Sequence, residues 1–206
     1  MQHKKLVLGV ALATAILTAC SGQSVPAFAP TESSLYITSE GKVTSATVET
    51  YEADYYGTDE LKAFVEEVLA DFHASAGESS TAAIKECTLA DGTAKLLIDF
   101  QSAEAYLDFM EQYPDEESAI QVTDLDITTV SDGVTKGCLV GKTFTKLAKE
   151  QTTVAADEVM KQSKLYVAAI DGAALIQTDG TIQYISEGVS VVGTNTIQTP
   201  EDEVSY

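Results

Sequence analysis

The stretch TDELKAFVEEVLADF at residues 58–72 decides the fold, because it contains the clearest helix of the chain. Apolar residues follow Leu61 at the spacing of one helix face, namely Leu61, Phe64, Val65, Val68, Leu69 and Phe72. This spacing predicts an amphipathic helix that packs one side on a core. Thr58 is predicted as its N-cap, and Asp59 and Glu60 in the first turn stabilise the positive end of the helix dipole.

A hairpin is predicted before this helix. A short apolar strand at 35–38 leads to a turn at Glu40-Gly41, and a strand rich in Thr, Val and Tyr follows from Val43 to Tyr55. The same plan recurs downstream, with strands at 83–89 and 94–100 joined by a turn at Asp91-Gly92. Ser102 is the expected N-cap of a second helix, whose core face carries Tyr106, Phe109, Met110 and Tyr113 and which ends at Pro114.

Beyond Pro114 the pattern is weaker but follows the same plan. A third hairpin is predicted at 125–130 and 134–140, with its turn at Asp132-Gly133, and a helical stretch at 155–162. Five short strands separated by Gly-containing turns then predict a meander, at 165–170, 174–177, 181–186, 189–192 and 196–199. The expected fold is therefore α+β, with antiparallel β-hairpins, two or three helices packed on one face, and a C-terminal β-meander.

The first twenty residues are typical of an export signal. His3, Lys4 and Lys5 form a basic start, and the apolar run at 6–17 is too short for a membrane-spanning helix. The run ends in Leu17-Thr18-Ala19-Cys20, which resembles the lipobox of bacterial lipoproteins. This resemblance implies that Cys20 receives a diacylglyceryl group and that a lipoprotein signal peptidase cuts before it. The alternative is an ordinary signal peptide followed by an unmodified cysteine.

A second resemblance concerns the mature part. Residues 55–62 (YYGTDELK), the strand at 95–100 and Ser102-Ala103-Glu104 look like segments of small lipoproteins of unknown function from anaerobic Gram-positive bacteria. In such cells the anchor would lie in the outer leaflet of the cytoplasmic membrane. In a double-membrane cell, Ser21 after the cysteine would instead permit export to the outer membrane.

Five segments are expected along the chain: a signal peptide at 1–19, a lipidated flexible tether at 20–34, a hairpin-helix region at 35–163, a β-meander on the same domain at 164–199, and an acidic frayed tail at 200–206. The formal charge of −20 falls to −22 when Lys4 and Lys5 are removed, and the chain has no arginine. Such a surface repels phosphate backbones and lacks a guanidinium group for anions, so nucleic-acid binding is not expected. Cations and basic partners remain compatible with it.

The sequence predicts no catalytic residue, no metal site and no cofactor. His73 is the one histidine outside the signal segment, which excludes a zinc site with two histidines, and it is interpreted as a surface residue. Ser39 and Lys42 match a Ser-x-x-Lys pattern, but they lie on a predicted hairpin turn without its companion motifs. The acidic residues at 49–60 and 115–117 lack the spacing of a calcium-binding EF-hand loop.

Cys87 and Cys138 are the other two cysteines, and both fall in predicted strands. Outside the cytoplasm they would either form a disulfide or stay as buried thiols, and both alternatives are kept. The sequence as a whole favours a lipid-anchored, non-enzymatic module that binds a protein, an envelope component or a cation. The alternative is an envelope hydrolase that uses an Asp/Glu pair. The binding component of an importer is disfavoured, because such proteins usually have two lobes.

Overall fold

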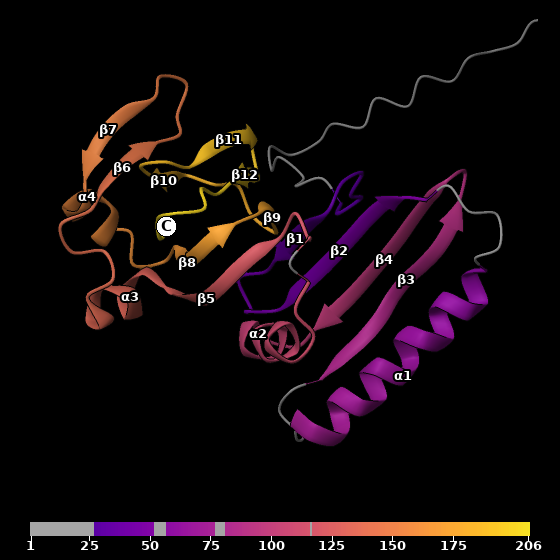
Figure 1. Cartoon of the computed structure of the whole chain (residues 1–206). Coiled ribbons are helices and arrows are strands. Elements are labelled where there is room, and N and C mark those ends of the chain that lie inside the picture. The colour runs from indigo at the N-terminus through magenta and orange to yellow at the C-terminus, as the bar shows by residue number, and fades with distance from the viewer. Residues whose placement is uncertain (1–26, 52–56, 77–80, 116) are drawn as a thin grey trace, which may run out of the picture.

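The computed structural model describes residues 27–51, 57–76, 81–115 and 117–206 as an α+β fold (Figure 1). The signal segment and Cys20 lie outside the described residues. Four helices are present in the described chain: α1 (Thr58–Ala76), α2 (Ala103–Gln112), α3 (Val130–Lys136) and α4 (Ala156–Met160). The strands are β1 (Ser34–Ile37), β2 (Val43–Thr50), β3 (Ala82–Ala90), β4 (Thr93–Phe100), β5 (Gln121–Thr129), β6 (Thr143–Lys146), β7 (Thr152–Ala155), β8 (Tyr166–Ala173), β9 (Leu175–Thr178), β10 (Tyr184–Ser186), β11 (Ser190–Gly193) and β12 (Thr196–Gln198).

The first two predicted hairpins are confirmed, and they supply four of the strands of a seven-stranded sheet with the order β11-β12-β9-β1-β2-β4-β3. Gly41 closes the first turn with a φ of 81°, a conformation that glycine adopts without steric cost. Asp91 and Gly92 close the second with φ values of 52° and 74°, as a two-residue hairpin turn requires. The strand expected to reach Tyr55 ends at Thr50, and Tyr55 lies outside the described residues.

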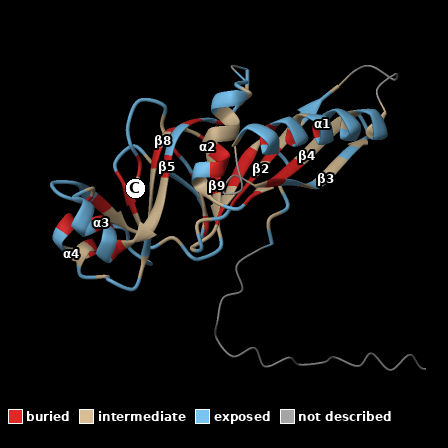
Figure 2. Cartoon of the chain, turned by 90° about the horizontal axis from the view of Figure 1, so that it is seen from below, coloured by how far each residue is buried: buried red, intermediate tan, exposed pale blue. Residues whose placement is uncertain are grey.

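Helices α1 and α2 pack on one face of this sheet, as expected (Figure 2). Ser102 is the N-cap of α2, since its hydroxyl accepts a hydrogen bond from the Ala105 amide at 3.1 Å. The helices meet through Phe72 of α1 and Phe109 of α2, whose ring centroids are 5.2 Å apart in a T-shaped arrangement. Aromatic pairs in this geometry stabilise the fold beyond the contribution of the apolar area that they bury.

Two details of α1 differ from the prediction. Phe64 was expected on the core face but is 63% exposed, because the residues that reach the sheet fully are Val65, Leu69 and Phe72. Thr58 is the first helical residue rather than the N-cap, and its hydroxyl accepts a hydrogen bond from the Leu89 amide of β3 at 3.2 Å. This bond ties the start of the helix to the sheet edge.

The third predicted hairpin is wrong. Its first strand is the end of β5, but α3 follows directly, with Thr129 as N-cap accepting from the Asp132 amide at 3.1 Å. Gly137, with a φ of 77°, ends the helix in a left-handed C-cap. Cys138 therefore lies in the turn after α3 and not in a strand. The signal that was missed is the pair of Thr129 and Gly137 at the helix boundaries.

The predicted C-terminal series of short strands is confirmed, and its members join three sheets. β8 pairs with β5 as a two-stranded ribbon, β10 pairs with β6, and β9 and β12 join the main sheet. Within the main sheet β9 runs parallel to β1, the one parallel pair among the described strands, with Ile37 opposite Thr178. That pair brings together segments that lie far apart in the sequence.

The segments expected to be flexible are packed where the structure describes them. Before β1, the Phe28 ring stacks on Tyr36 at 5.1 Å, so the expected tether of 20–34 is folded against the sheet from residue 27 onward. The tail at 200–206 was expected to be frayed, but Ser205 and Ile170 exchange two backbone hydrogen bonds of 2.8 and 2.9 Å. Tyr206 accepts a third from the Ser186 amide. The tail thus pairs with β8 and contacts β10.

Buried apolar residues form two clusters. The main core lies between the seven-stranded sheet and α1 and α2, and it includes Leu35, Phe72, Phe100, Tyr106 and Ile176. The small core lies among α3, α4, β6 and β7, and it consists of Val130, Leu139, Phe144, Ala156 and Val159. The β5–β8 ribbon joins them, because its Leu125 and Ile170 belong to the main core whereas Val167 packs against the small core.

Candidate ligand-binding pocket

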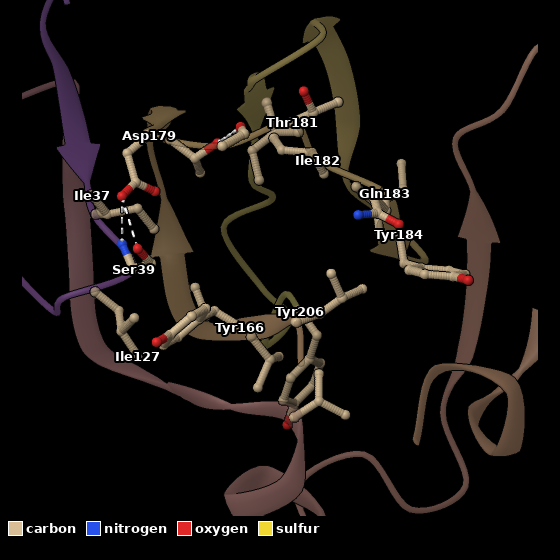
Figure 3. Close-up of a pocket in the computed structure, with 18 of the residues that line it drawn as sticks. Ile37, Ser39, Ile127, Tyr166, Asp179, Thr181, Ile182, Gln183, Tyr184 and Tyr206 are labelled. Carbon is tan, nitrogen blue, oxygen red and sulfur yellow. Dashed lines mark hydrogen bonds between the residues drawn. The ribbon is translucent and has the colours of Figure 1, made fainter. Parts of the chain in front are cut away.

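A pocket of about 460 Å³ lies where the two cores meet (Figure 3). Ile37, Ile170 and Ile197 line it from the main core, and Phe144 and Val159 line it from the small core. The volume falls in the range of small-molecule sites, which are lined mainly by apolar and aromatic side chains with a few polar groups. The elements that contribute to both clusters, the β5–β8 ribbon and β10, also contribute to the pocket lining, through Ile170, Val167 and Tyr184 among others.

The polar groups of the pocket gather where β1 and β9 end. Parallel pairing places the carboxyl ends of both strands at one edge, so the residues that follow them, Ser39 and Asp179, become neighbours. The Asp179 amide donates to the Ile37 carbonyl at 3.2 Å, which fixes the chain at this point. Figure 3 shows Ser39 and Asp179 side by side at one side of the pocket. The carboxyl ends of parallel strands are a common location for ligand sites.

Asp179 is held by two hydrogen bonds from one residue. Ser39 donates both its backbone N–H, at 3.0 Å, and its hydroxyl, at 2.9 Å, to Asp179 Oδ2. Both donors are neutral, so they orient the carboxylate without cancelling its charge. Burial, and secondly the negative charge of Asp179, raise the pKa of the neighbouring Tyr36 hydroxyl. The Asp179 carboxyl group is thus held in one orientation at the polar, solvent-exposed end of the pocket.

Three tyrosines line the rest of the pocket together with apolar side chains. Tyr166 is 55% exposed at the start of β8, Tyr184 begins β10, and Tyr206 comes from the tail. Lys142 Nζ lies 5.2 Å from the ring centroid of Tyr206, and Lys146 Nζ lies 5.8 Å from that of Tyr184. Burial raises the pKa of the Tyr206 hydroxyl, and the neighbouring Cys138 adds to this rise. Ammonium groups therefore already approach two of the three rings, those of Tyr184 and Tyr206.

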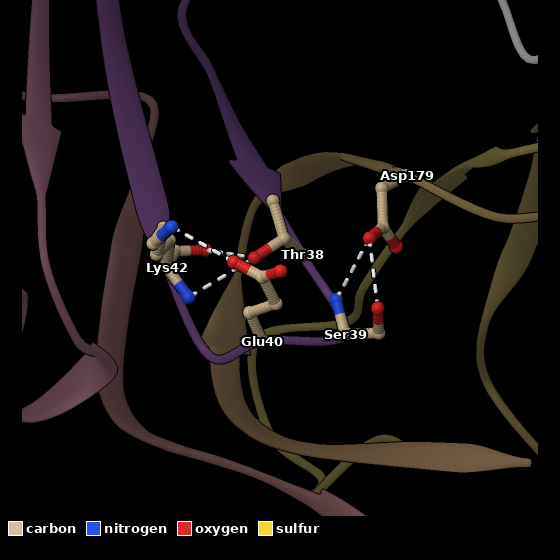
Figure 4. A network of polar contacts seen from close by, with 5 residues as sticks. All are labelled: Thr38, Ser39, Glu40, Lys42 and Asp179. Carbon is tan, nitrogen blue, oxygen red and sulfur yellow. Dashed lines mark hydrogen bonds and ion pairs between the residues drawn. The ribbon is translucent and has the colours of Figure 1, made fainter.

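The Ser-x-x-Lys pattern is not assembled for catalysis (Figure 4). Lys42 Nζ forms an ion pair with Glu40 at 2.8 Å, whereas the Ser39 hydroxyl donates to Asp179. The hydrogen bond with Glu40, and then its charge, raise the pKa of Lys42. A lysine that activates a serine must be unprotonated and within hydrogen-bond reach of it. Ser39 is instead a structural partner of Asp179.

The other singled-out residues lie away from this pocket. His73 is exposed on α1, as predicted, and its Nε2 accepts a hydrogen bond from the Ala82 amide at 3.1 Å. Cys87 on β3 and Cys138 after α3 are free cysteines, so the structure contains no bridge between them. Cys138 donates to the Gly133 carbonyl at 3.2 Å, and burial raises the pKa of the Cys87 thiol.

A second pocket, of about 360 Å³, lies between the β1–β2 turn, the start of α2 and β5. It is lined by four acidic residues: Glu40, Glu104, Asp108 and Asp126. Among the residues that the structure describes, no three His, Cys, Asp or Glu side chains are grouped so as to hold a metal ion. No helix in the described ranges is both long and apolar enough to cross a membrane.

The sequence did not reveal the pocket. Ser39 and Asp179 are 140 positions apart, and only the parallel pairing of β1 with β9 makes them neighbours. Neither residue belongs to a motif that would have indicated the contact. Comparison of the chain with protein-family models, with curated proteins and with solved structures found no match.

Proposed function

We propose that the chain is an extracytoplasmic lipoprotein, anchored through Cys20, whose folded part binds a small amphiphilic molecule in the pocket between the two cores. The anchor rests on the basic start, the apolar run and the lipobox-like residues before Cys20. The observation that carries the binding role is the pocket itself, with apolar walls, three tyrosines and a single oriented carboxylate. That combination accommodates an apolar body and fixes its polar end.

The hydrolase alternative is better suited to the second pocket. Most glycoside hydrolases need two carboxyl groups that flank the bond to be cleaved. Asp179 is the one acidic side chain in the lining of the first pocket, whereas the second pocket has four. Loss of a glycan-cleaving activity in a Glu104→Gln variant, with ligand binding in the first pocket retained, would favour the alternative.

The anchor is tested with the full chain expressed in a Gram-positive bacterium that is fed labelled palmitate. We expect label on the protein and its recovery in the membrane fraction, because two or more acyl chains hold a protein stably at a bilayer. A Cys20→Ala variant should lose both. A Cys87→Ala variant is the matched control and should keep both. Label that persists in Cys20→Ala would refute the assignment.

The pocket is tested by thermal unfolding of the chain from Ser21 onward, which contains every described residue, in the presence of octanol, octylamine or octanoate. A ligand that binds the folded state raises the midpoint temperature of unfolding. At a ligand concentration of about a hundred times the dissociation constant, it stabilises the folded state by about 2.7 kcal/mol. Ala168→Phe, which places a ring in the pocket lining, should abolish the shift. Ala63→Phe, at an exposed position of α1, should leave it unchanged. If none of the three compounds produces a saturable shift, the binding role is wrong.

A further inference from the structure

The polar end of the pocket has an unused acceptor. Both Ser39 donors bind Asp179 Oδ2, and no hydrogen bond within the described chain uses Oδ1. Six ion pairs are present among the described residues, and none of them includes Asp179. A carboxylate that is oriented and lacks a cationic partner attracts a positively charged hydrogen-bond donor.

The charges of the pocket are separated along its length. Lys164 has the other charged side chain of the lining and lies in the turn between α4 and β8. The strand after it starts with Tyr166 opposite Thr129, at the α3 end of the ribbon, so Lys164 lies towards the small core. Asp179 lies at the main-sheet end, beside β1. A cationic head group is therefore drawn to the main-sheet end and repelled from the other.

Between these ends the lining is mainly apolar. Ile127, Ile182 and Val167 contribute from β5, from the segment before β10 and from β8. An apolar ligand body gains free energy there by leaving water, about 25 cal/mol for each Å² buried. The formal charge of −20 also raises the concentration of cations near the surface. The apolar walls, the single Asp179 carboxylate and the negative charge of the whole protein together favour an amphiphilic cation as the ligand.

We infer that this pocket binds a primary amine with an apolar body, which donates hydrogen bonds from its ammonium group to Asp179 Oδ1 while Ser39 holds Oδ2. This assignment rests on the proposed binding function and names its ligand class. It disfavours fatty acids and other apolar anions whose carboxylate lies at this end, because that carboxylate would face Asp179.

The test compares octylamine, octanol and octanoate, which share one chain length, by calorimetric titration at pH 7 and low salt. Octylamine should bind about tenfold more tightly than octanol, since a charge-assisted hydrogen bond contributes more than a neutral one. Octanoate should bind most weakly. The chain from Ser21 onward is used, as above.

Asp179→Asn should reduce the affinity for octylamine about tenfold, to the level of octanol, and leave octanol binding unchanged. The unchanged octanol affinity would show that the variant pocket is intact. Asp71→Asn removes the same charge from an exposed position of α1 and should have little effect. Lys164→Gln should maintain or improve octylamine binding.

Three outcomes would overturn the inference in different ways. Equal binding of octylamine and octanol, unaffected by Asp179→Asn, would refute the amine assignment and leave the binding function standing. No binding of any compound would refute both. If Lys164→Gln lost as much octylamine affinity as Asp179→Asn, the selection for a cation would not come from Asp179. If Asp179→Asn also lowers the affinity for octanol, the Ser39→Ala variant tests the assignment instead. This variant keeps the Asp179 carboxylate, so it must still bind octylamine more tightly than octanol.

Discussion

The small core is built from one continuous stretch of the chain, residues 130–159, whereas the main core collects strands and helices from Leu35 to Ile197. β1 with β2 and β3 with β4 are hairpins, but the main sheet also pairs β2 with β4 and β1 with β9, and α1 packs on β3. In the small core, β6 pairs with β7, its neighbour in the sequence, and β10 joins them from outside that stretch, with Tyr184 opposite Lys146 (Figure 1). Among the residues that the structure describes, nineteen buried residues form the main core and five form the small core.

The difference in size predicts a difference in stability. A region with few buried apolar contacts opens locally at a lower free energy than the core of the molecule. The small core should therefore open before the main sheet, and it forms one wall of the pocket through Phe144 and Val159. A ligand in the pocket would contact both cores and so stabilise the weaker one.

The strongest test truncates one aromatic residue in each core. Phe72→Ala should lower the free energy of unfolding by about 3–5 kcal/mol, because Phe72 is fully buried and its loss leaves a cavity. Phe144→Ala should accelerate amide hydrogen exchange in 143–160 and leave exchange in β2 and β4 unchanged. Urea unfolding and hydrogen exchange measure the two effects. Faster exchange in the main sheet of Phe144→Ala would show that the cores unfold together.

Gly172→Ala tests the ribbon that joins the cores. Gly172 has a φ of 105°, and a Cβ atom there would lie 1.9 Å from the Gln121 carbonyl oxygen of β5. We expect a loss of about 2–3 kcal/mol in the free energy of unfolding, from backbone strain and overpacking. Gly180→Ala, where a Cβ meets no atom within 4 Å, is the control and should change little. Equal stability of the two variants would contradict the close approach of β5 and β8.

Two helix caps provide a matched comparison of smaller size. Ser102 caps α2 in the main core, and Thr129 caps α3 beside the small core. Each substitution to alanine should cost about 1 kcal/mol of helix stability. Ser102→Ala should lower the global unfolding midpoint in urea, whereas Thr129→Ala should mainly increase hydrogen exchange in α3. A global loss of the same size in both variants would argue against separate opening of the small core.

The smallest effect is expected at Phe64. This residue shares α1 with Phe72 but is 63% exposed, so Phe64→Ala should change the free energy of unfolding by less than about 0.5 kcal/mol. Thermal or urea unfolding measures it against Phe72→Ala. A loss above about 2 kcal/mol would place Phe64 in a buried interface, for example with a second copy of the chain.

Prediction from the sequence succeeded where structure depends on local patterns. Each successful prediction used a signal that spans only a few residues. These signals are the hairpin turns at Glu40-Gly41 and Asp91-Gly92, the Ser102 cap and the apolar face around Phe72. It failed at α3, where Asp132-Gly133 is as compatible with a hairpin as with a short helix. It also failed at the tail, because nothing local indicates that Ser205 pairs with Ile170.

By itself the sequence determined the α+β class, the two hairpin-helix units and the series of short C-terminal strands, because propensity, capping and periodicity are local properties. Only the tertiary structure decided which strands pair across the chain and where the pocket lies. The parallel contact of β1 with β9 places Asp179 beside Ser39, and the ribbon sets the small core against the main one. Such contacts depend on the burial of surfaces that are remote in the sequence, and no pattern at either residue specifies its partner.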